Sequence, residues 1–153
     1  MKPQELALMF ARNRIAFGIG FVLLPGSMGR LWIGDDAKRP TVKLLTRALG
    51  VRDLAIGLGT AIALDRGTPV RGWLEAAALS DAIDLVATLL ASGSIPDSSR
   101  NVVAAIAGGS AVAGVALARA LDEPPAPDEI EAPEAALTGH PPPASPRPAP
   151  GAG

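Results

Sequence analysis

The sequence predicts an all-α fold, namely a four-helix transmembrane bundle followed by a disordered Pro/Ala-rich C-terminal tail. Three observations lead to this prediction. Long uncharged segments recur along residues 1–121, short stretches rich in Gly, Pro and Asp separate them, and Pro and acidic residues dominate from residue 122 onward. Spans of about 20 apolar residues suit a bilayer, and Gly/Pro clusters mark the turns between helices. We therefore expect a membrane domain over 1–121 and a tail over 122–153.

The first helix is expected over about residues 5–33, with a kink at Pro25. Proline removes a backbone donor and clashes with the preceding turn of a helix. The apolar run lacks a clean small-residue cleavage site before Pro25, so we expect it to be retained. Trp32, near the end of the segment, suits the membrane–water interface.

Three further helices are expected at 41–64, 70–91 and 99–121, joined by short polar turns. These segments are apolar around most of their circumference, whereas a soluble amphipathic helix shows a charged face. The fourth segment, with an uncharged run over 101–118, has no such face. The alternative is a soluble all-α bundle with unusually apolar helices, since two of the segments carry charges.

Composition excludes several function classes. Residues 1–121 hold 13 Lys/Arg and 9 Asp/Glu, and residues 122–153 hold one Arg and six acids. Neither part has the dense basic patch that nucleic acid requires, so no nucleic-acid partner is expected. Residues 141–148 are proline-rich and suit an extended, solvated tail, with a docking role as the less favoured alternative.

Cofactor and metal sites are not expected. The chain has no cysteine, and its one histidine, His140, lies in the tail. Zinc or haem held by imidazole or thiolate is therefore not predicted in the helical part. No phosphate-binding loop, dinucleotide fingerprint or nucleophile elbow occurs. We expect a protein that is not an enzyme.

The candidate site is a cluster of charged residues on the second and third predicted helices: Arg47, Arg52, Asp53, Asp81 and Asp84. Asp81 and Asp84 share one helix face, because residues three apart are neighbours on a helix. The short turn makes the two helices antiparallel. Asp53 then lies level with Asp81, and Arg47 and Arg52 fall on either side of Asp84.

The depth of these acids requires partners. Asp81 is eleven residues past Val70, which is roughly 16 Å and about halfway across a ~30 Å hydrocarbon layer. A charge at mid-helix costs about 2.5–3.5 kcal/mol. We therefore expect the acids to pair with Arg47 and Arg52, since the guanidinium fork holds two carboxylate oxygens at once. Two arginines against three acids leave one acid over, and that acid should hold its proton.

Two interpretations of the cluster remain open. In the first it is structural and locks the helix hairpin in register. In the second it is a polar pocket for an ion, a proton or a lipid headgroup. The expected function is that of a small integral membrane protein, non-enzymatic, which binds lipid or a partner or assists membrane assembly. The alternative is a proton- or ion-coupled carrier component; a membrane enzyme ranks third.

Partners and topology follow from the same segments. Membrane lipid is the expected partner, and the small-residue pair Ser110 and Gly114 also allows a homo-oligomer or a membrane protein partner, although packing inside the bundle is favoured. Four spans put both ends on one side of the cell membrane. Seven basic residues then lie with the termini and five on the other side, which favours cytoplasmic termini.

Several short pieces resemble a known group of proteins. These are Leu31-Trp32-Ile33-Gly34 after Pro25, the stretch from Arg47 to Gly57, Trp73-Leu74, and Ser80-Asp81-Ala82-Ile83-Asp84. Together they resemble small four-helix bacterial membrane proteins catalogued as domains of unknown function, over about residues 5–120. The resemblance implies a fold and a membrane location and brings no activity.

Overall fold

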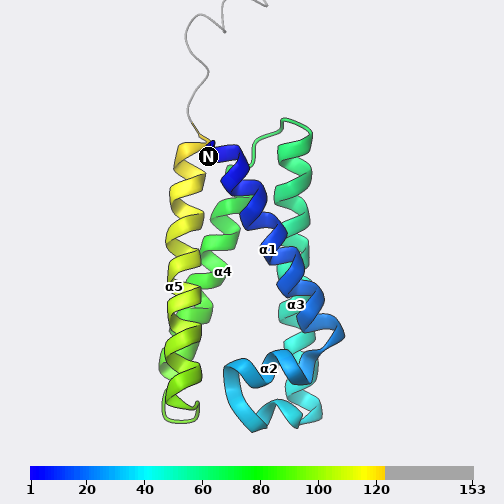
Figure 1. Cartoon of the computed structure of the whole chain (residues 1–153), viewed down its shortest axis with the longest axis vertical. Coiled ribbons are helices and arrows are strands. Elements are labelled where there is room, and N and C mark those ends of the chain that lie inside the picture. Colours follow the sequence, from blue (N-terminus) through cyan, green and yellow to red (C-terminus); the bar gives the residue numbers. More distant parts are fainter. Residues whose placement is uncertain (123–153) are drawn as a thin grey trace, which may run out of the picture. The chain divides into compact units, whose positions relative to one another are not determined.

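The computed structural model describes residues 1–122, which are helical apart from short connections. The elements are α1 (Pro3–Leu23), α2 (Pro25–Ile33), the short 3-10 helix η1 (Gly34–Lys38), α3 (Pro40–Asp65), α4 (Arg71–Leu90) and α5 (Asp97–Ala120) (Figure 1). The predicted all-α class is confirmed for this part of the chain. The predicted tail, apart from Asp122, lies outside the described residues.

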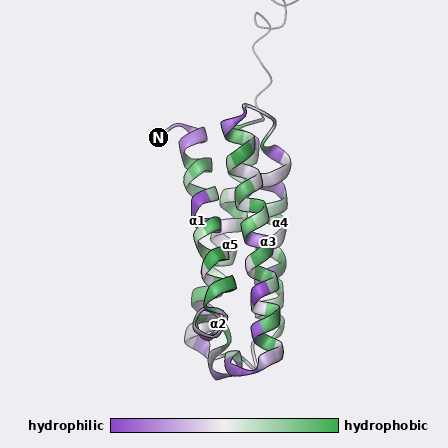
Figure 2. Ribbon diagram, turned by 90° about the vertical axis from the view of Figure 1, so that its right-hand side faces the viewer, coloured by the Kyte–Doolittle hydropathy of each residue, from purple (hydrophilic) through white to green (hydrophobic). Residues whose placement is uncertain are grey.

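The segment 5–33, which proline was expected to kink or interrupt at Pro25, forms two helices instead of a single kinked one. Leu24 leaves the helical region at φ −122° and ψ 50°, and Pro25 begins α2. Pro25 has no N–H to continue the α1 ladder, so α2 turns away and lies across the end of the bundle (Figures 1 and 2). With 9 residues, α2 is only about 14 Å long.

The other predicted helices match α3, α4 and α5 to within two residues at each end. Proline occupies the first position of α3 at Pro40, where its missing N–H has no helical partner to lose. Gly67 has φ 61°, in the left-handed region that glycine adopts without strain, and this makes the turn between α3 and α4 short.

The long helices pack as two pairs, α1 with α3 and α4 with α5. Glycine allows the first pair to approach closely: a methyl group added to Gly50 would lie 2.8 Å from the carbonyl oxygen of Gly18. Gly57 is equally close, because its Cβ position is 2.9 Å from the carbonyl oxygen of Ala11. Gly50 and Gly57, which share one face of α3, therefore receive α1. The antiparallel α3 and α4 make fewer contacts with each other than α3 makes with α1.

Small residues also bring α4 and α5 together. A methyl group on Gly114 would lie 3.0 Å from the Cβ of Ala78 and 3.1 Å from the carbonyl oxygen of Leu74. This confirms that Gly114 packs inside the bundle.

Most of the buried apolar residues are alanines, and many large apolar residues are exposed. The largest fully buried side chains are Leu74, Thr60 and Thr88. One small core cluster joins Ala63, Val70, Leu74 and Ala118. Figure 2 shows that hydrophobic residues recur along the length of the helices. Exposed apolar side chains occur on every long helix, and examples are Phe17, Leu45, Leu58, Ile83, Ile106 and Val112.

Among the helices of residues 1–122, α1 and α5 are long and apolar enough, by length and composition, to cross a membrane. α3 and α4 carry the charged residues that the sequence singled out.

Candidate functional site

Charged side chains from three helices form one network near the middle of the bundle. In order of contact they run Asp81, Arg14, Asp53, Arg52, Asp84, so that acids and bases alternate. α1 supplies Arg14, α3 supplies Arg52 and Asp53, and α4 supplies Asp81 and Asp84. We call these five residues the ion network.

Arg14 is the most deeply buried residue of the network, with 7% of its surface exposed. Its Nη1 donates to Asp53 Oδ1 at 2.9 Å, and its Nη2 donates to the carbonyl oxygen of Ala77 at 3.1 Å. The same Nη2 forms a close ion pair with Asp81 Oδ2. The guanidinium carbon also lies 5.5 Å from the ring centroid of Phe10, a cation–π distance. Arg14 therefore connects α1 to both α3 and α4.

Arg52 makes the second connection between α3 and α4. Its Nη1 and Nη2 donate to the two oxygens of Asp84 at 3.1 Å and 2.6 Å, a bidentate pair. Its Nη2 also donates to Asp53 Oδ1 at 3.2 Å. Asp53 Oδ1 thus accepts hydrogen bonds from both arginines.

One face of α4 makes these contacts. Ala77, Asp81, Asp84 and Thr88 are spaced three or four residues apart and so lie on one side of the helix. Thr88 Oγ1 accepts a hydrogen bond from Trp32 Nε1 of α2 at 3.0 Å. The predicted shared face of Asp81 and Asp84 is confirmed, as is the placement of Asp53 beside Asp81, since one guanidinium contacts both.

Arg47 is not part of the network, which corrects the sequence prediction. It is exposed, and its Nε donates to the carbonyl oxygen of Val22 at 3.3 Å. Helix rotation explains this, because Arg47 is five residues before Arg52 and points about 140° away from it around α3. Arg14 takes the place predicted for Arg47.

The sequence pattern did not indicate Arg14 as a site residue, because Arg14 directly precedes the first apolar run and resembles a flanking basic residue. A signal was present. Ala7, Ala11, Arg14 and Gly18 follow helical spacing, and all four are the buried residues of α1. An arginine in a row of small residues indicates a face that packs against another helix.

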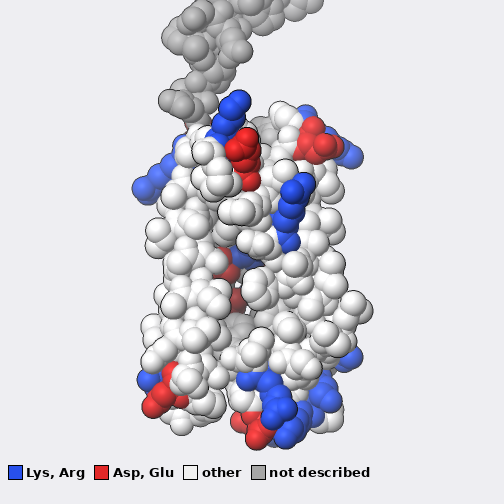
Figure 3. Space-filling model, viewed as in Figure 1, with Lys and Arg blue, Asp and Glu red and all other residues white. Residues whose placement is uncertain are grey.

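The network keeps the predicted imbalance of charge, with three carboxylates against two guanidinium groups. Among the buried side-chain atoms of residues 1–122, Arg14 Nε, Ser80 Oγ and Asp81 Oδ2 have no hydrogen-bond partner within this part of the chain. Asp81 Oδ2 nevertheless contacts Arg14 Nη2; the two atoms are close enough for an ion pair but not aligned as a hydrogen bond. Figure 3 shows acidic and basic side chains recessed in a hollow at mid-height, well away from the charges at the two ends.

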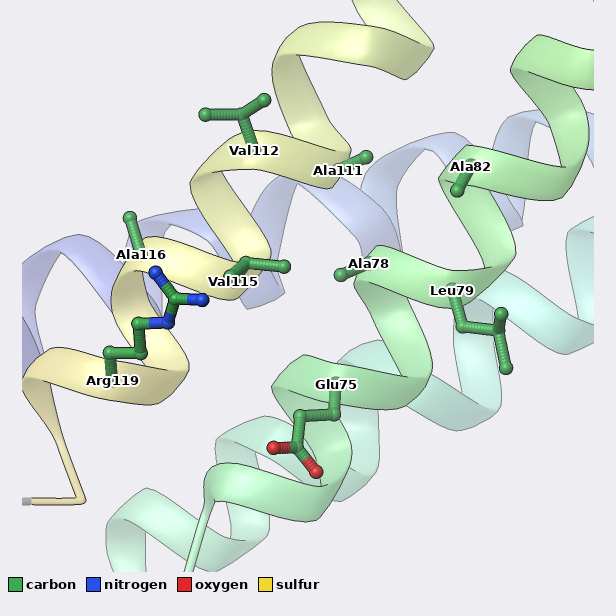
Figure 4. A pocket seen from close by; sticks show the side chains of 9 residues that line it. All are labelled: Glu75, Ala78, Leu79, Ala82, Ala111, Val112, Val115, Ala116 and Arg119. Atoms are coloured by element: carbon green, nitrogen blue, oxygen red, sulfur yellow. The ribbon is translucent and has the colours of Figure 1, made fainter.

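A separate groove of 580 Å³ lies between α4 and α5 and includes none of the five network residues. Figure 4 shows its lining of alanine and valine side chains, with Glu75 and Arg119 at one end on opposite helices. Its surface is methyl and methylene groups, which suits packing against an apolar chain rather than chemistry on a substrate.

Among residues 1–122, no group of three or more His, Cys, Asp or Glu side chains is arranged to hold a metal ion. The three network carboxylates instead meet guanidinium groups.

No protein-family model, curated protein or solved structure matches the chain. The resemblance to small four-helix bacterial membrane proteins therefore stays a prediction.

Proposed function

We propose that this protein is a small multi-pass protein of the cell membrane that binds lipid or a membrane partner and has no enzymatic activity. The observation that carries the proposal is a reversed distribution of polarity. The buried polar and charged residues of the described chain are Arg14, Thr46, Thr60, Ser80, Asp81 and Thr88. Large apolar side chains, in contrast, are exposed on every long helix. Soluble monomers rarely expose large contiguous apolar patches.

The positions of the surface charges support the same proposal. Figure 3 shows most charged side chains gathered at the two ends; the surface between them is mostly uncharged, apart from the recessed hollow and a basic side chain above it. We call the end that holds the start of α1 and the end of α5 the terminal end, and the opposite end the α2 end. A mostly uncharged surface between charged ends is what a helical bundle presents to hydrocarbon.

The lengths of the helices fit four spans. The helices α1, α3, α4 and α5 have 21, 26, 20 and 24 residues, so each is about 30 Å or longer, enough for a hydrocarbon core of about 30 Å. α3 and α4 are less apolar because they carry the ion network. Pairing lowers the cost of these charges, because each guanidinium meets carboxylates inside the bundle instead of lipid.

The ion network joins the two helix pairs in this proposal. Small residues pack α1 on α3 and α4 on α5, but between the pairs the contacts are few. Arg14 and Arg52 cross that boundary to Asp81 and Asp84. In a bilayer, where apolar packing between helices has no hydrophobic driving force, polar contacts of this kind hold helices together.

The basic residues at the two ends of the bundle are nearly equal in number. With Arg14 in the network and Arg47 at the α2 end, the counts of basic residues that favoured cytoplasmic termini change. The described basic residues of the terminal end are Lys2, Arg12, Arg66, Arg71 and Arg119, and those of the α2 end are Arg30, Lys38, Arg39, Lys43, Arg47 and Arg100. A difference of five against six gives the positive-inside rule little to act on.

The test is membrane fractionation combined with reporter fusions. We expect the full chain to stay with membranes through an alkaline carbonate wash and to be released by detergent. Reporters fused after residues 36 and 94 should lie on one side of the membrane, and reporters after 67 and 121 on the other. A chain that stays in the aqueous fraction without detergent, monomeric and folded, would overturn the proposal.

A proton- or ion-coupled carrier component is the second candidate. The observation in its favour is the uneven network, in which three carboxylates share two guanidinium groups and buried polar atoms lack partners. In vesicles containing a pH-sensitive dye, a carrier should lose pH-driven flux in Asp81→Asn and keep it in Asp97→Asn, which changes an exposed acid at the start of α5. Equal flux in both variants, or none in the wild-type chain, would rule this candidate out.

A further inference from the structure

A second charged feature lies at the α2 end. A groove of 360 Å³ is lined there by four basic side chains, Arg30, Lys38, Lys43 and Arg47. We call it the cationic groove. Its members come from α2, η1 and α3, which meet because the chain reverses direction through η1 after Gly34 at φ 65°. Figure 3 shows Lys and Arg side chains gathered at the lower end of the molecule.

Most of this positive charge is uncompensated. Asp35 is paired with two of the four cations, Arg30 at 3.3 Å and Lys38 at 2.9 Å. Within the described residues Lys43 and Arg47 have no carboxylate within 4.0 Å. The hydrogen bond from Lys38, with the charges of Lys38 and Arg30, lowers the pKa of Asp35 below its usual value. Asp35 is therefore ionised at neutral pH, and four cations against one acid leave three positive charges.

The structure holds the two unpaired cations in place. The Cε of Lys43 lies 3.4 Å from the Cβ position of Gly26, so its aliphatic stem rests on the start of α2. The Nε of Arg47 donates to Val22 O at 3.3 Å, a carbonyl left free because α1 ends at the proline. The two terminal nitrogens of Arg47 remain for a ligand. Gly26 and Ser27 also line the groove, and first-turn N–H groups have no helical partners.

Apolar surface borders the groove. Leu24 lines it and is 57% exposed; Leu23, which precedes it, and Leu44, which follows Lys43, are 69% and 65% exposed. A free phosphate ion would contact only the basic side chains. A molecule with an anionic group and acyl chains would also cover the leucines.

We propose that the cationic groove binds the phosphodiester of an anionic glycerophospholipid, with Lys43 and Arg47 on the phosphate and the acyl chains along the neighbouring leucines. This rests on the proposed membrane location and deepens it by naming the class of lipid. Arginine and lysine are the usual phosphate ligands of proteins, and basic pockets at the ends of membrane helices suit anionic headgroups. A zwitterionic headgroup carries its own ammonium, which the three positive charges repel.

The experiment measures lipid binding to the purified full chain in detergent by native mass spectrometry. Phosphatidylglycerol and phosphatidylethanolamine are titrated separately. We expect phosphatidylglycerol to bind more tightly, and the double variant Lys43→Gln/Arg47→Gln to weaken its binding about thirtyfold, because each basic residue near an anionic lipid contributes roughly a fivefold factor. The matched control is Arg66→Gln/Arg119→Gln at the terminal end, which removes the same charge and should leave binding unchanged.

Two further variants separate charge from folding. Lys43→Arg/Arg47→Lys keeps both charges and should keep binding. Asp35→Asn frees Arg30 and Lys38 and should tighten binding of phosphatidylglycerol. Loss of binding in the charge-conserving variant, with unchanged circular dichroism, would contradict the proposal.

Three further outcomes show whether the bound phosphate belongs to a lipid, and whether a failure concerns the cationic groove or the proposed membrane location. If inorganic phosphate binds the lipid-free chain as tightly as phosphatidylglycerol does, the ligand of the groove is a free anion and the proposal is overturned. If the chain is integrated in the membrane but binds both lipids equally, only the proposed selectivity of the cationic groove is overturned. A chain that fractionates as a soluble protein would overturn the membrane location first.

Discussion

At the scale of single residues, Arg14 is the group on which the ion network depends. Its guanidinium contacts Asp53 and Asp81, and so it links a carboxylate on α3 with one on α4. Loss of Arg14 leaves both acids buried with less compensation, and such a loss costs far more than the pair contributes when intact.

Arg14→Ala should therefore destabilise the protein by about 3–5 kcal/mol. The measurement is the midpoint of unfolding of the detergent-solubilised chain. Arg12→Ala is the matched control on the same helix, because Arg12 is exposed and its loss should cost less than about 1 kcal/mol. Equal destabilisation by the two variants would mean that the network does not hold the bundle together.

The three acids should differ in what their neutralisation costs. Asp53 Oδ1 accepts from both arginines, at 2.9 Å from Arg14 and 3.2 Å from Arg52. Asp53→Asn leaves two guanidinium groups side by side without the anion between them. Asp81 is the first residue in the row of five, so Asp81→Asn removes a charge only at its end. The four remaining residues, two acids and two bases, still alternate in charge.

We expect Asp53→Asn to cost about 3 kcal/mol, since hydrogen bonds to charged groups contribute about 1.5–3 kcal/mol each. Asp81→Asn should cost no more than half of that. The same unfolding midpoints give both values. A larger loss in Asp81→Asn than in Asp53→Asn would reverse the order of importance inferred from the contacts.

The sequence predicts four of the five network residues and misassigns the fifth. Arg52, Asp53, Asp81 and Asp84 lie on helices whose spacing and connection bring them together, so counting residues was enough. Arg47 was predicted in the network and Arg14 is found there instead, because the prediction took helices adjacent in the chain to be adjacent in space. A short turn makes α3 and α4 antiparallel, but it does not decide which helix fills the space beside them.

At the scale of elements, glycine decides which helices pair. α1 approaches α3 so closely that a Cβ on Gly50 would lie 2.8 Å from Gly18 O and 2.8 Å from Phe21 Cβ. Gly109, near the middle of α5, has nothing within 4 Å of its Cβ position. The two positions offer the same substitution in a packed and in an open setting.

Gly50→Ala should destabilise by about 1–3 kcal/mol, because the helices must separate to admit the methyl group. Gly109→Ala should be neutral or should stabilise by up to about 1 kcal/mol, through reduced freedom of the unfolded chain. Thermal unfolding in detergent measures both. If the two variants behaved alike, close contact between α1 and α3 would not be the reason for the pairing.

Helix bounds were predictable because Gly and Pro mark them, as at Pro25, Pro40 and Gly67. The residue spacing within one helix does not show which other helix packs on its small-residue face. Gly50 and Gly57 are seven residues apart and so share a helix face, yet nothing in this spacing distinguishes α1 from α4 as the helix that packs on it. Pairing depends on complementary surfaces, which only the assembled chain presents.

At the scale of the whole described chain, large apolar side chains are exposed along the long helices, while the ion network is enclosed between them. Ile106 is 54% exposed and lies near the middle of α5, whereas Asn101 is exposed close to its start. In water, an arginine at either surface position would change stability by no more than about 0.5 kcal/mol. In a bilayer the two positions are unequal, because the cost of a charge depends on its depth.

We therefore expect Ile106→Arg to raise the free energy of insertion of α5 by about 3 kcal/mol, the cost of arginine at the centre of a membrane helix. Asn101→Arg should insert as the wild-type chain does, since an arginine near a helix end reaches the headgroups. A reporter after residue 121, compared with one after residue 94, measures the fraction of chains in which α5 crosses the membrane. If Ile106→Arg left that fraction unchanged, the exposed apolar surface of α5 would not face lipid, and the reversed polarity would require a protein partner to cover it.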